Sequence, residues 1–440
     1  MNHDLVNTFG RTLAETERLR RAKLTLYQAP LLQRLLRHAR DTTAFYRTRV
    51  PADCDSAEAI EEAWNSIPIL TRVEANANRD ALTSNAVPPE TGGTVREETS
   101  GSTGLPFEFI KSGLTVAATQ ALTERMFRWW TIDGAKSLAR IAYDRDKTAP
   151  PPDGMMTVGW HSSGTAGLAH RLDAAADTDV QLEWLLHRRP EYLAAFSTNL
   201  HRLALRAIGR GLDLKFERII SFGTRVDPAI RVDCRSAFGA EIADSYGSQE
   251  VGHVATQCPD CGEYHLAVEA SRIEILRDVD NKPARPGESG RIVATPFYNY
   301  AMPLIRYDMG DYAEAGTNNP KCRRGLPTIR RILGRARNRF RFADGTVAWP
   351  ELADFRLREL LRYRDIQLVQ VALDQIEVRY VPENDDAAPG NGEPGNGEAV
   401  ERRVREVLRQ AVGVSLAAKD SLGRITYGKI EDFVCLIANR

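Results

Sequence analysis

The chain has 440 residues, of which 42% are hydrophobic and 27% are charged. This composition is ordinary for a globular protein, and the length predicts two or three domains. The 59 basic residues balance 59 acidic ones, so nothing in the net charge indicates binding to nucleic acid or to a membrane. No apolar stretch is long enough to span a bilayer. The N-terminus lacks the pattern of a signal peptide, and the cysteines are scattered, so we expect a cytoplasmic protein whose partners are small molecules.

The first half of the chain is mostly helical by its pattern. Leucines at helical spacing predict one or two amphipathic helices over 11–40. We expect further helices over 114–130 and over 182–208, the latter broken at Arg189-Pro190. Short apolar runs at 218–223 and 241–247 predict buried strands, and strands and turns follow from about 265 to 312. Helices that alternate with strands predict an α/β fold.

The last hundred residues predict a separate small unit. Its expected elements are two strands, a mobile loop rich in Asp, Pro, Gly and Asn, a helix and a final strand, over residues 366–373, 375–381, 383–398, 399–412 and 430–437. This order is typical of a small α+β domain.

A Ser/Thr/Gly loop at Thr99–Pro106 is the main candidate for phosphate binding. Its glycines allow the backbone to approach a ligand closely, and its hydroxyls can donate to phosphate oxygens. The alternative interpretation is an ordinary turn or linker of the same composition.

The loop reads Thr-Ser-Gly-Ser-Thr-Gly-Leu-Pro. Together with the upstream segment Pro68-Ile-Leu-Thr-Arg72, it resembles the adenylate-forming superfamily of acyl-CoA synthetases, peptide-synthetase adenylation domains and luciferases, in its phenylacetate-CoA ligase-like branch. The resemblance implies a large N-terminal domain for ATP and substrate, residues 1–333, and a small C-terminal lid domain, residues 334–440. It also implies that the loop binds ATP through Thr99, Ser100, Gly101, Ser102, Thr103 and Gly104.

Further motifs extend the resemblance. Asp244-Ser-Tyr-Gly-Ser-Gln-Glu250 resembles the segment in which an aromatic ring packs on adenine and a glutamate holds Mg2+. Pro303-Leu-Ile-Arg-Tyr-Asp-Met-Gly-Asp311 resembles the segment whose aspartate binds the ribose hydroxyls, and Gly334-Arg335 resembles the domain junction. Gly223 stands where the family has an adenine-side loop. By resemblance, the further ATP-binding residues are Gly223, Tyr246, Gly247, Asp311 and Arg335, with Glu250 as the Mg2+ ligand.

The C-terminal motif Gly423-Arg-Ile-Thr-Tyr-Gly-Lys429 resembles the segment that supplies the catalytic lysine. Lys429 and Glu250 are therefore the predicted catalytic residues, since a lysine can neutralise the charge that develops on the α-phosphate. The acidic residues that follow Gly-Arg in the family are replaced here by Ala336-Arg337-Asn338.

Cysteine and histidine spacing predicts a structural zinc site. Cys258 and Cys261 form a Cys-x2-Cys pair, His265 follows four residues later, and Cys322 can complete the four ligands of a tetrahedral site. Some members of the branch resemble this arrangement, with a further cysteine where this chain has Arg324. Two alternatives stay open: His253 in place of His265, or reduced cysteines without a metal.

The resemblance implies an ATP-dependent, AMP-forming ligase that adenylates a carboxylic acid, most simply an aromatic one, and transfers the acyl group to CoA. Trp160 and His161 could line the acid pocket or could be ordinary packing residues. Alternative acceptors are an amine, as in an amide-bond ligase, or an arylamine that reacts with activated nitrite, as in a diazotase. A non-catalytic nucleotide-binding regulator is the alternative of another class. The branch also leads us to expect a homodimer.

Overall fold

The computed structural model describes residues 3–52, 54, 56–99, 106–161, 164–317, 321–382, 395–422 and 431–437. The chain divides into two compact units. The first comprises residues 1–138, 157–169 and 243–333, and the second comprises 139–156, 170–242 and 334–440. Among the described residues, no helix combines the length and the apolar character needed to cross a lipid bilayer.

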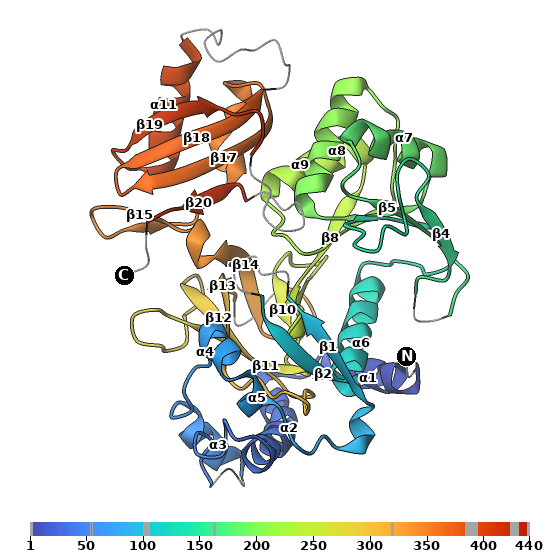
Figure 1. Cartoon of the computed structure of the whole chain (residues 1–440), viewed down its shortest axis with the longest axis vertical. Coiled ribbons are helices and arrows are strands. Elements are labelled where there is room, and N and C mark those ends of the chain that lie inside the picture. Colours follow the sequence, from blue (N-terminus) through green and yellow to red (C-terminus); the bar gives the residue numbers. More distant parts are fainter. Residues whose placement is uncertain are drawn as a thin grey trace. The chain divides into compact units, whose positions relative to one another are not determined.

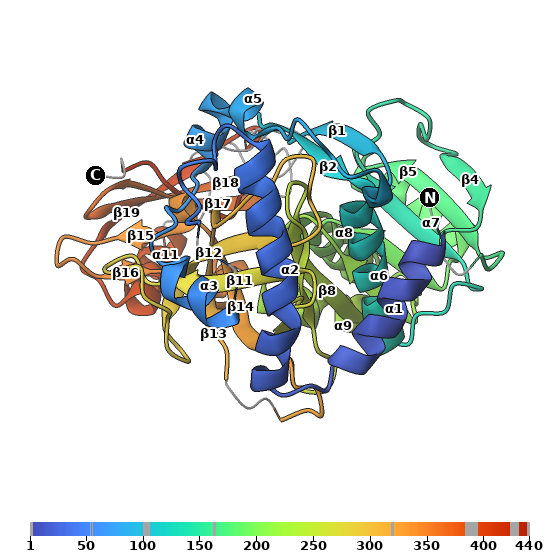
Figure 2. The ribbon, with the colours of Figure 1, turned by 90° about the horizontal axis from the view of Figure 1, so that it is seen from below.

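The helices of the first unit come from its N-terminal part. They are α1 (His3–Thr16), α2 (Arg21–Thr42), α3 (Ala57–Trp64), α4 (Arg72–Ala77), α5 (Arg79–Leu82), the 3-10 turn η1 (Pro89–Thr91) and α6 (Gly113–Trp129). The helical pattern over 11–40 thus corresponds to two helices. Figure 2 shows α1 alongside α6, where apolar residues of both helices share a small buried cluster.

The strands of the first unit form a hairpin and a larger sheet, in which most neighbouring strands are antiparallel. A hairpin of β1 (Thr94–Glu98) and β2 (Glu108–Ser112) holds the ends of the Ser/Thr/Gly loop, whose residues 100–105 lie outside the described part. The larger sheet runs in the order β11-β12-β13-β14-β10-β9-β8. Its strands are β8 (Glu241–Ser248), β9 (Gly252–Gln257), β10 (Tyr264–Leu266), β11 (Ser271–Leu276), β12 (Ser289–Pro296), β13 (Tyr307–Ala315) and β14 (Thr328–Arg335).

The middle of the chain forms the α/β part of the second unit. Its strands run in the order β7-β6-β3-β5, followed by β4, and β6 pairs with β7 in parallel. The elements are β3 (Leu138–Ala142), β4 (Met155–Val158), β5 (Leu168–Asp173), α7 (Thr178–Arg188), β6 (Tyr192–Ala195), α8 (Ser197–Arg210), β7 (Arg218–Ser221) and α9 (Pro228–Phe238). Leu193, Leu200 and Ile219 are fully buried in the core between these strands and helices. The prediction of one interrupted helix over 182–208 was wrong, because β6 separates α7 from α8.

The C-terminal part of the second unit carries its own sheet, in the order β19-β18-β17-β20 (Figure 1). The elements are η2 (Ala336–Asn338), β15 (Phe340–Arg341), β16 (Val347–Ala348), α10 (Leu352–Phe355), η3 (Leu357–Glu359), β17 (Tyr363–Ala372), β18 (Gln375–Pro382), α11 (Gly395–Leu408), β19 (Gly413–Ala418) and β20 (Phe433–Cys435). Val400 and Val404 of α11 are buried against Leu368 and Val378 of this sheet. The structure therefore adds β19, and α11 begins inside the predicted 383–398 loop, of which 383–394 lie outside the described residues.

Candidate nucleotide site and metal cluster

The predicted nucleotide-binding residues divide between the two units. Thr99, Tyr246, Gly247, Glu250 and Asp311 belong to the first unit. Gly223 and Arg335 belong to the second. Ser100, Gly101, Ser102, Thr103, Gly104 and Lys429 lie outside the described residues.

Tyr246 and Gly247 stand where β8 ends. The pairing of β8 with β9 is regular up to Tyr246 opposite Ala255 and then shifts between Tyr246 and Gly247. A side chain at Gly247 would meet the carbonyl oxygen of Gly252 at 2.3 Å, so only glycine fits this irregular turn. The turn then places Glu250 in the interior, with 3% of its surface exposed.

Tyr246 and Asp311 are hydrogen-bonded to each other. The Tyr246 hydroxyl donates to Oδ2 of Asp311 at 2.8 Å and also lies 3.8 Å from the sulfur of Met309. Asp311 is on β13, so the bond joins two motifs that are far apart in the sequence. A hydrogen bond to an ionised carboxylate fixes its orientation more firmly than one between neutral groups.

Glu250 also contacts β13. The hydroxyl of Tyr307, the first residue of that strand, donates to Glu250 Oε1 at 3.2 Å. Burial and the adjacent Glu250 carboxylate raise the pKa of Tyr307, so its hydroxyl keeps its proton and stays a donor. Tyr246 thus contacts Asp311, and Glu250 contacts Tyr307. The two residues of each pair of positions, 246 and 250 or 307 and 311, are four apart in the sequence.

Arg72 is a residue of this site that could not be identified from the sequence. Its Nη1 lies 3.8 Å from Glu250 Oε1, and its Nη2 donates to the Thr99 hydroxyl. The same hydroxyl accepts a hydrogen bond from the backbone N–H of Phe107 at 3.0 Å. Arg72 therefore links the buried glutamate to the first residue of the Ser/Thr/Gly loop.

The segment Pro68–Arg72 positions this arginine. The backbone N–H of Leu70 donates to the carbonyl of Arg306 at 2.9 Å, and the N–H of Asp308 donates back to the carbonyl of Leu70 at 2.9 Å. Thr71 then caps α4, because its hydroxyl accepts from the N–H of Glu74 at 3.2 Å. Arg72 is the first residue of α4. The segment Pro68-Ile-Leu-Thr-Arg72 carries part of the family resemblance, but its sequence alone indicated no function for Arg72.

The two predicted nucleotide residues of the second unit each have a fixed backbone. Gly223 has φ of +72°, a left-handed conformation that favours glycine. The next residue, Thr224, is held because its hydroxyl lies 2.7 Å from that of Ser197 at the start of α8. The backbone N–H of Arg335 donates to Asn338 Oδ1 at 2.9 Å.

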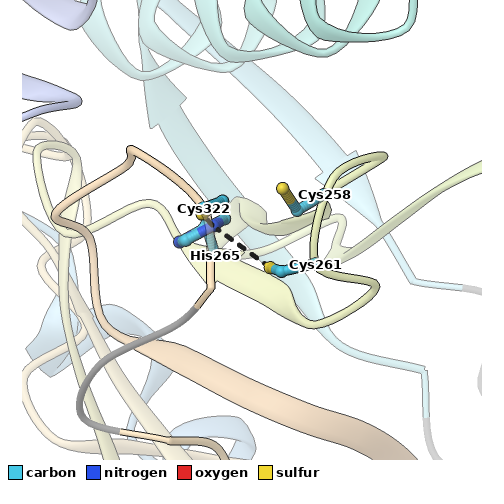
Figure 3. A group of neighbouring side chains, drawn as sticks. All are labelled: Cys258, Cys261, His265 and Cys322. Atoms are coloured by element: carbon cyan, nitrogen blue, oxygen red, sulfur yellow. Dashed lines mark hydrogen bonds between the residues drawn. The ribbon is translucent and has the colours of Figure 1, made fainter.

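The four predicted metal ligands lie together (Figure 3). The ligand atoms of Cys258, Cys261, His265 and Cys322 are all within 4.8 Å of one another. His265 Nε2 lies 3.2 Å from Cys322 Sγ and 3.8 Å from Cys261 Sγ. Three sulfur donors and one imidazole are a ligand set that suits zinc.

The surroundings of His265 fix the orientation and the protonation of its ring. Its Nδ1 donates to the carbonyl oxygen of Leu326 at 3.0 Å, which leaves the lone pair of Nε2 directed at the sulfurs. Burial lowers the pKa of His265 to about 4, so the ring is neutral at physiological pH. His253 instead makes a 2.7 Å hydrogen bond to the Thr256 hydroxyl and does not belong to the cluster of described residues.

Arg324 and Trp129 form an outer layer around the cluster. Arg324 Nη1 lies 3.1 Å from Cys258 Sγ, and its guanidinium lies over the Trp129 ring at 4.3 Å. The Trp129 ring also contacts the residue that follows α1, because Trp129 Nε1 donates to the carboxylate of Glu17 at 3.0 Å. The backbone N–H of Gly325 donates to the carbonyl of Glu17 at 2.8 Å. The loop that carries Cys322 is thereby joined to Glu17, the residue that follows α1.

Trp160 and His161 pack against α6 and the loop that follows it. Trp160 Nε1 donates to the carbonyl of Lys136 at 2.8 Å, and its ring meets Phe127 edge-on. His161 Nε2 lies 2.6 Å from a carboxylate oxygen of Glu124. These contacts give both side chains a packing role.

No protein-family model matches the sequence. Among curated proteins, the chain is 21% identical to Protein CapK of Staphylococcus aureus over 342 residues, which cover 73% of this chain and 70% of that protein. Among solved structures, it is similar to a 2-hydroxyisobutyryl-CoA ligase in complex with 2-HIB-AMP, with a TM-score of 0.74 and 17% identity over 96% of this chain and 91% of the other.

Two further solved structures extend this comparison. The anthranilate CoA ligase AuaEII in complex with anthranoyl-AMP has a TM-score of 0.56 and 13% identity over 91% of this chain and 79% of that one. The amide bond synthetase McbA from Marinactinospora thermotolerans has a TM-score of 0.51 and 17% identity over 84% and 75%. The chain therefore has the fold that these adenylate-forming ligases share.

Proposed function

We propose that this chain, which has the fold of the adenylate-forming ligases, is an ATP-dependent, AMP-forming ligase that activates a carboxylic acid. The observation that carries the proposal is the contact between the separate motifs. Tyr246 bonds to Asp311, Tyr307 bonds to Glu250, and Arg72 joins Glu250 to Thr99. An adenine-stacking ring, a ribose-binding carboxylate, a cation-binding carboxylate and the start of a phosphate loop are what a bound nucleotide requires.

Each of these side chains has a role that suits its chemistry. The Tyr246 ring provides a flat surface for adenine, and its hydroxyl orients Asp311 so that this carboxylate can accept from the ribose hydroxyls. Arg72 and Tyr307 both contact the same carboxylate oxygen of Glu250, Oε1. The second carboxylate oxygen can then bind Mg2+, a hard cation that prefers oxygen ligands. When bound, Mg2+ would neutralise charge on the phosphates during transfer.

The reaction follows from this arrangement and from the sequence of the C-terminal motif. An oxygen of the substrate carboxylate attacks the α-phosphorus of ATP, the bond to the β-phosphate oxygen breaks, and acyl-AMP and pyrophosphate form. Lys429 stabilises the negative charge that develops in this step. A nucleophile then attacks the acyl carbon, and AMP leaves. The resemblance to the family supports two further roles, with Arg335 at the ribose or phosphates and Gly223 beside adenine.

For the substrate we propose an aromatic carboxylic acid, and for the acceptor the thiol of CoA. The resemblance to the phenylacetate-CoA ligase-like branch supports both choices. The similar structures include an anthranilate CoA ligase, whose acid is aromatic. They also include an amide bond synthetase, which supports an amine as the alternative acceptor. Activated nitrite with an arylamine is the other acceptor chemistry that the assay below includes.

We further propose that the cluster of Cys258, Cys261, His265 and Cys322 binds a structural zinc ion. A closed set of four protein ligands leaves no open position for substrate, which distinguishes a structural site from a catalytic one. Its role would be to hold the loop around Cys322 against β10 and the end of α1.

A pyrophosphate-release screen tests the proposed function. Purified protein with ATP and Mg2+ is offered aromatic acids, aliphatic acids and nitrite, each with and without CoA or an arylamine. We expect acid-dependent pyrophosphate release that is lost in Lys429→Ala, while calorimetry shows that this variant still binds ATP. Binding of ATP without pyrophosphate release from any acid would instead support a nucleotide-binding regulator. AMP release that depends on CoA or on the amine identifies the acceptor.

A further inference from the structure

Arg306 is a buried arginine with an unusual backbone conformation. It stands directly before β13, only 3% of its surface is exposed, and its φ of +50° lies in the left-handed region that residues other than glycine seldom adopt. Such a conformation costs free energy, so it persists only where surrounding contacts hold it, and it is common at functional sites. The next residue is Tyr307, which donates to Glu250.

The Arg306 guanidinium binds the chain at the end of α3. Its Nη1 donates to the carbonyl oxygen of Ile67 at 2.8 Å and to that of Trp64, the last residue of α3, at 3.3 Å. Its Nη2 donates to Glu274 Oε1 at 3.2 Å. The last carbonyl groups of a helix have no partner within the helix, and a planar guanidinium can donate to several acceptors at once. The side chain therefore joins the end of α3 to Glu274 of β11.

The backbone of Arg306 holds the next part of the same segment. Its N–H donates to the Thr295 hydroxyl at 2.8 Å, which fixes it to β12, and its carbonyl accepts from the N–H of Leu70 at 2.9 Å. The side chain and the backbone of one residue thus form an anchor for residues 64–70. Arg72 follows two residues later, at the start of α4.

We propose that Arg306 is a positioning residue for adenylation, which acts by fixing the place of Arg72. This inference rests on the proposed function, in which Glu250 holds Mg2+ and Thr99 begins the phosphate loop. The Arg72 guanidinium lies between these two groups, 3.8 Å from Glu250 Oε1 and hydrogen-bonded to the Thr99 hydroxyl. A shift of the backbone that carries Arg72 would break both contacts, and small displacements in an active site lower the rate strongly.

Substitution of Arg306 tests the proposal through kcat/KM for ATP in pyrophosphate release. Lysine keeps the charge but lacks the planar fork that reaches three acceptors here, so we expect Arg306→Lys to lower kcat/KM by about tenfold or more. Arg306→Met with Glu274→Gln removes the anchor without leaving either charge unpaired in the interior, and it should show a similar loss. Arg272→Ala is the matched control and should leave kcat/KM nearly unchanged. The Arg272 guanidinium lies over the Trp64 ring at 4.1 Å, but its hydrogen bonds go to the Glu61 carboxylate on α3.

A double variant separates positioning from general stability. If Arg306 acts through Arg72, then Arg72→Ala with Arg306→Lys should have the same kcat/KM as Arg72→Ala alone, although its melting temperature should still be lower. A further loss of kcat/KM equal to that of Arg306→Lys by itself would overturn the proposal. Wild-type kcat/KM in Arg306→Lys or in Arg72→Ala would overturn it as well.

Hydrogen exchange gives a readout that does not depend on activity. Peptides that cover 68–78 should exchange faster in Arg306→Lys than in wild type or in Arg272→Ala, because the anchor limits local opening of this segment. Unchanged exchange overturns the anchor even if no acid proves to be a substrate. Faster exchange in a protein that releases no pyrophosphate would support the anchor and refute the proposed function, so the two failures are distinguishable.

Discussion

Removal of the Tyr246 hydroxyl should weaken ATP binding more than it slows chemistry. In Tyr246→Phe the aromatic surface for adenine stays, but the 2.8 Å hydrogen bond to Asp311 is lost. Asp311 then has to be held in place by its remaining contacts while it binds the ribose. The ribose contacts are the same in the ground state and in the transition state, so the loss should raise KM for ATP and leave kcat nearly unchanged.

The size of the effect follows from the type of bond. A hydrogen bond to a charged group contributes about 1.5–3 kcal/mol. Tyr246 and Asp311 are both partly exposed, so water can replace part of the bond and the lower end applies. About 1.5 kcal/mol corresponds to roughly a tenfold increase in KM. Tyr246→Ala should raise KM for ATP further, because loss of stacking on adenine costs about 1–3 kcal/mol more binding free energy.

The assay is steady-state pyrophosphate release with ATP as the varied substrate, together with calorimetry of ATP binding. The matched control is Tyr312→Phe, since the Tyr312 hydroxyl also donates to a carboxylate at 2.8 Å, that of the exposed Asp278. A double-mutant cycle of Tyr246→Phe with Asp311→Ala should give a coupling of about 1.5 kcal/mol. An unchanged KM in Tyr246→Phe, or an equal change in Tyr312→Phe, would refute the reasoning.

Three further predictions concern the rest of the chain. Metal analysis should find about one zinc ion per chain, and the Cys322→Ser variant should lose that ion. Loss of zinc should shift the tryptophan emission of this variant to the red. The shift should be absent when Trp129 is also replaced by Phe. Burial raises the pKa of Asp432 to about 6, so its ionisation makes the folded state less stable as the pH rises from about 4 to 6. Asp432→Asn should therefore raise the melting temperature above pH 6 and change it little below pH 4. The corresponding gain in the free energy of unfolding above pH 6 is at most about 3 kcal/mol. Gly334 has φ of +102°, so Gly334→Ala should lower stability in a denaturation experiment by about 1–3 kcal/mol.

Long periodic segments could be predicted from the sequence, and short buried ones could not. The helix predicted over 114–130 is α6, and the paired strands predicted around residue 374 are β17 and β18. Strand β6 was missed, because it consists of Tyr192-Leu-Ala-Ala, all buried, with no alternation of polar and apolar residues. Leucine and alanine also favour helices, so it is the pairing with the neighbouring strands β7 and β3 that makes this run a strand.

In the candidate site, too, individual motifs could be predicted from the sequence, but the contacts between motifs far apart in the chain could not. The sequence named Tyr246, Glu250 and Asp311 by their motifs, each in isolation. It did not reveal that Tyr246 donates to Asp311, because that requires knowledge of which turn lies beside β13. Arg72 was missed for the same reason: its contacts with Thr99 and Glu250 exist only after Leu70 has joined the backbone of β13.

The geometry of the Cys/His cluster explains why His265, and not His253, lies among the proposed metal ligands. Cys258 and Cys261 occupy the turn between β9 and β10, and His265 is in the middle of β10, where its Nδ1 reaches the carbonyl of Leu326 just beyond Cys322. That hydrogen bond draws the Cys322 loop onto the same strand that carries the histidine. His253, which lies on β9 ahead of the turn, has its Nε2 engaged by Thr256. Spacing alone admits both residues, and the choice depends on the backbone that each imidazole can contact. The same contact predicts that removal of the proposed zinc ion should first perturb the Cys322 loop and, through it, Trp129 and the residue that follows α1.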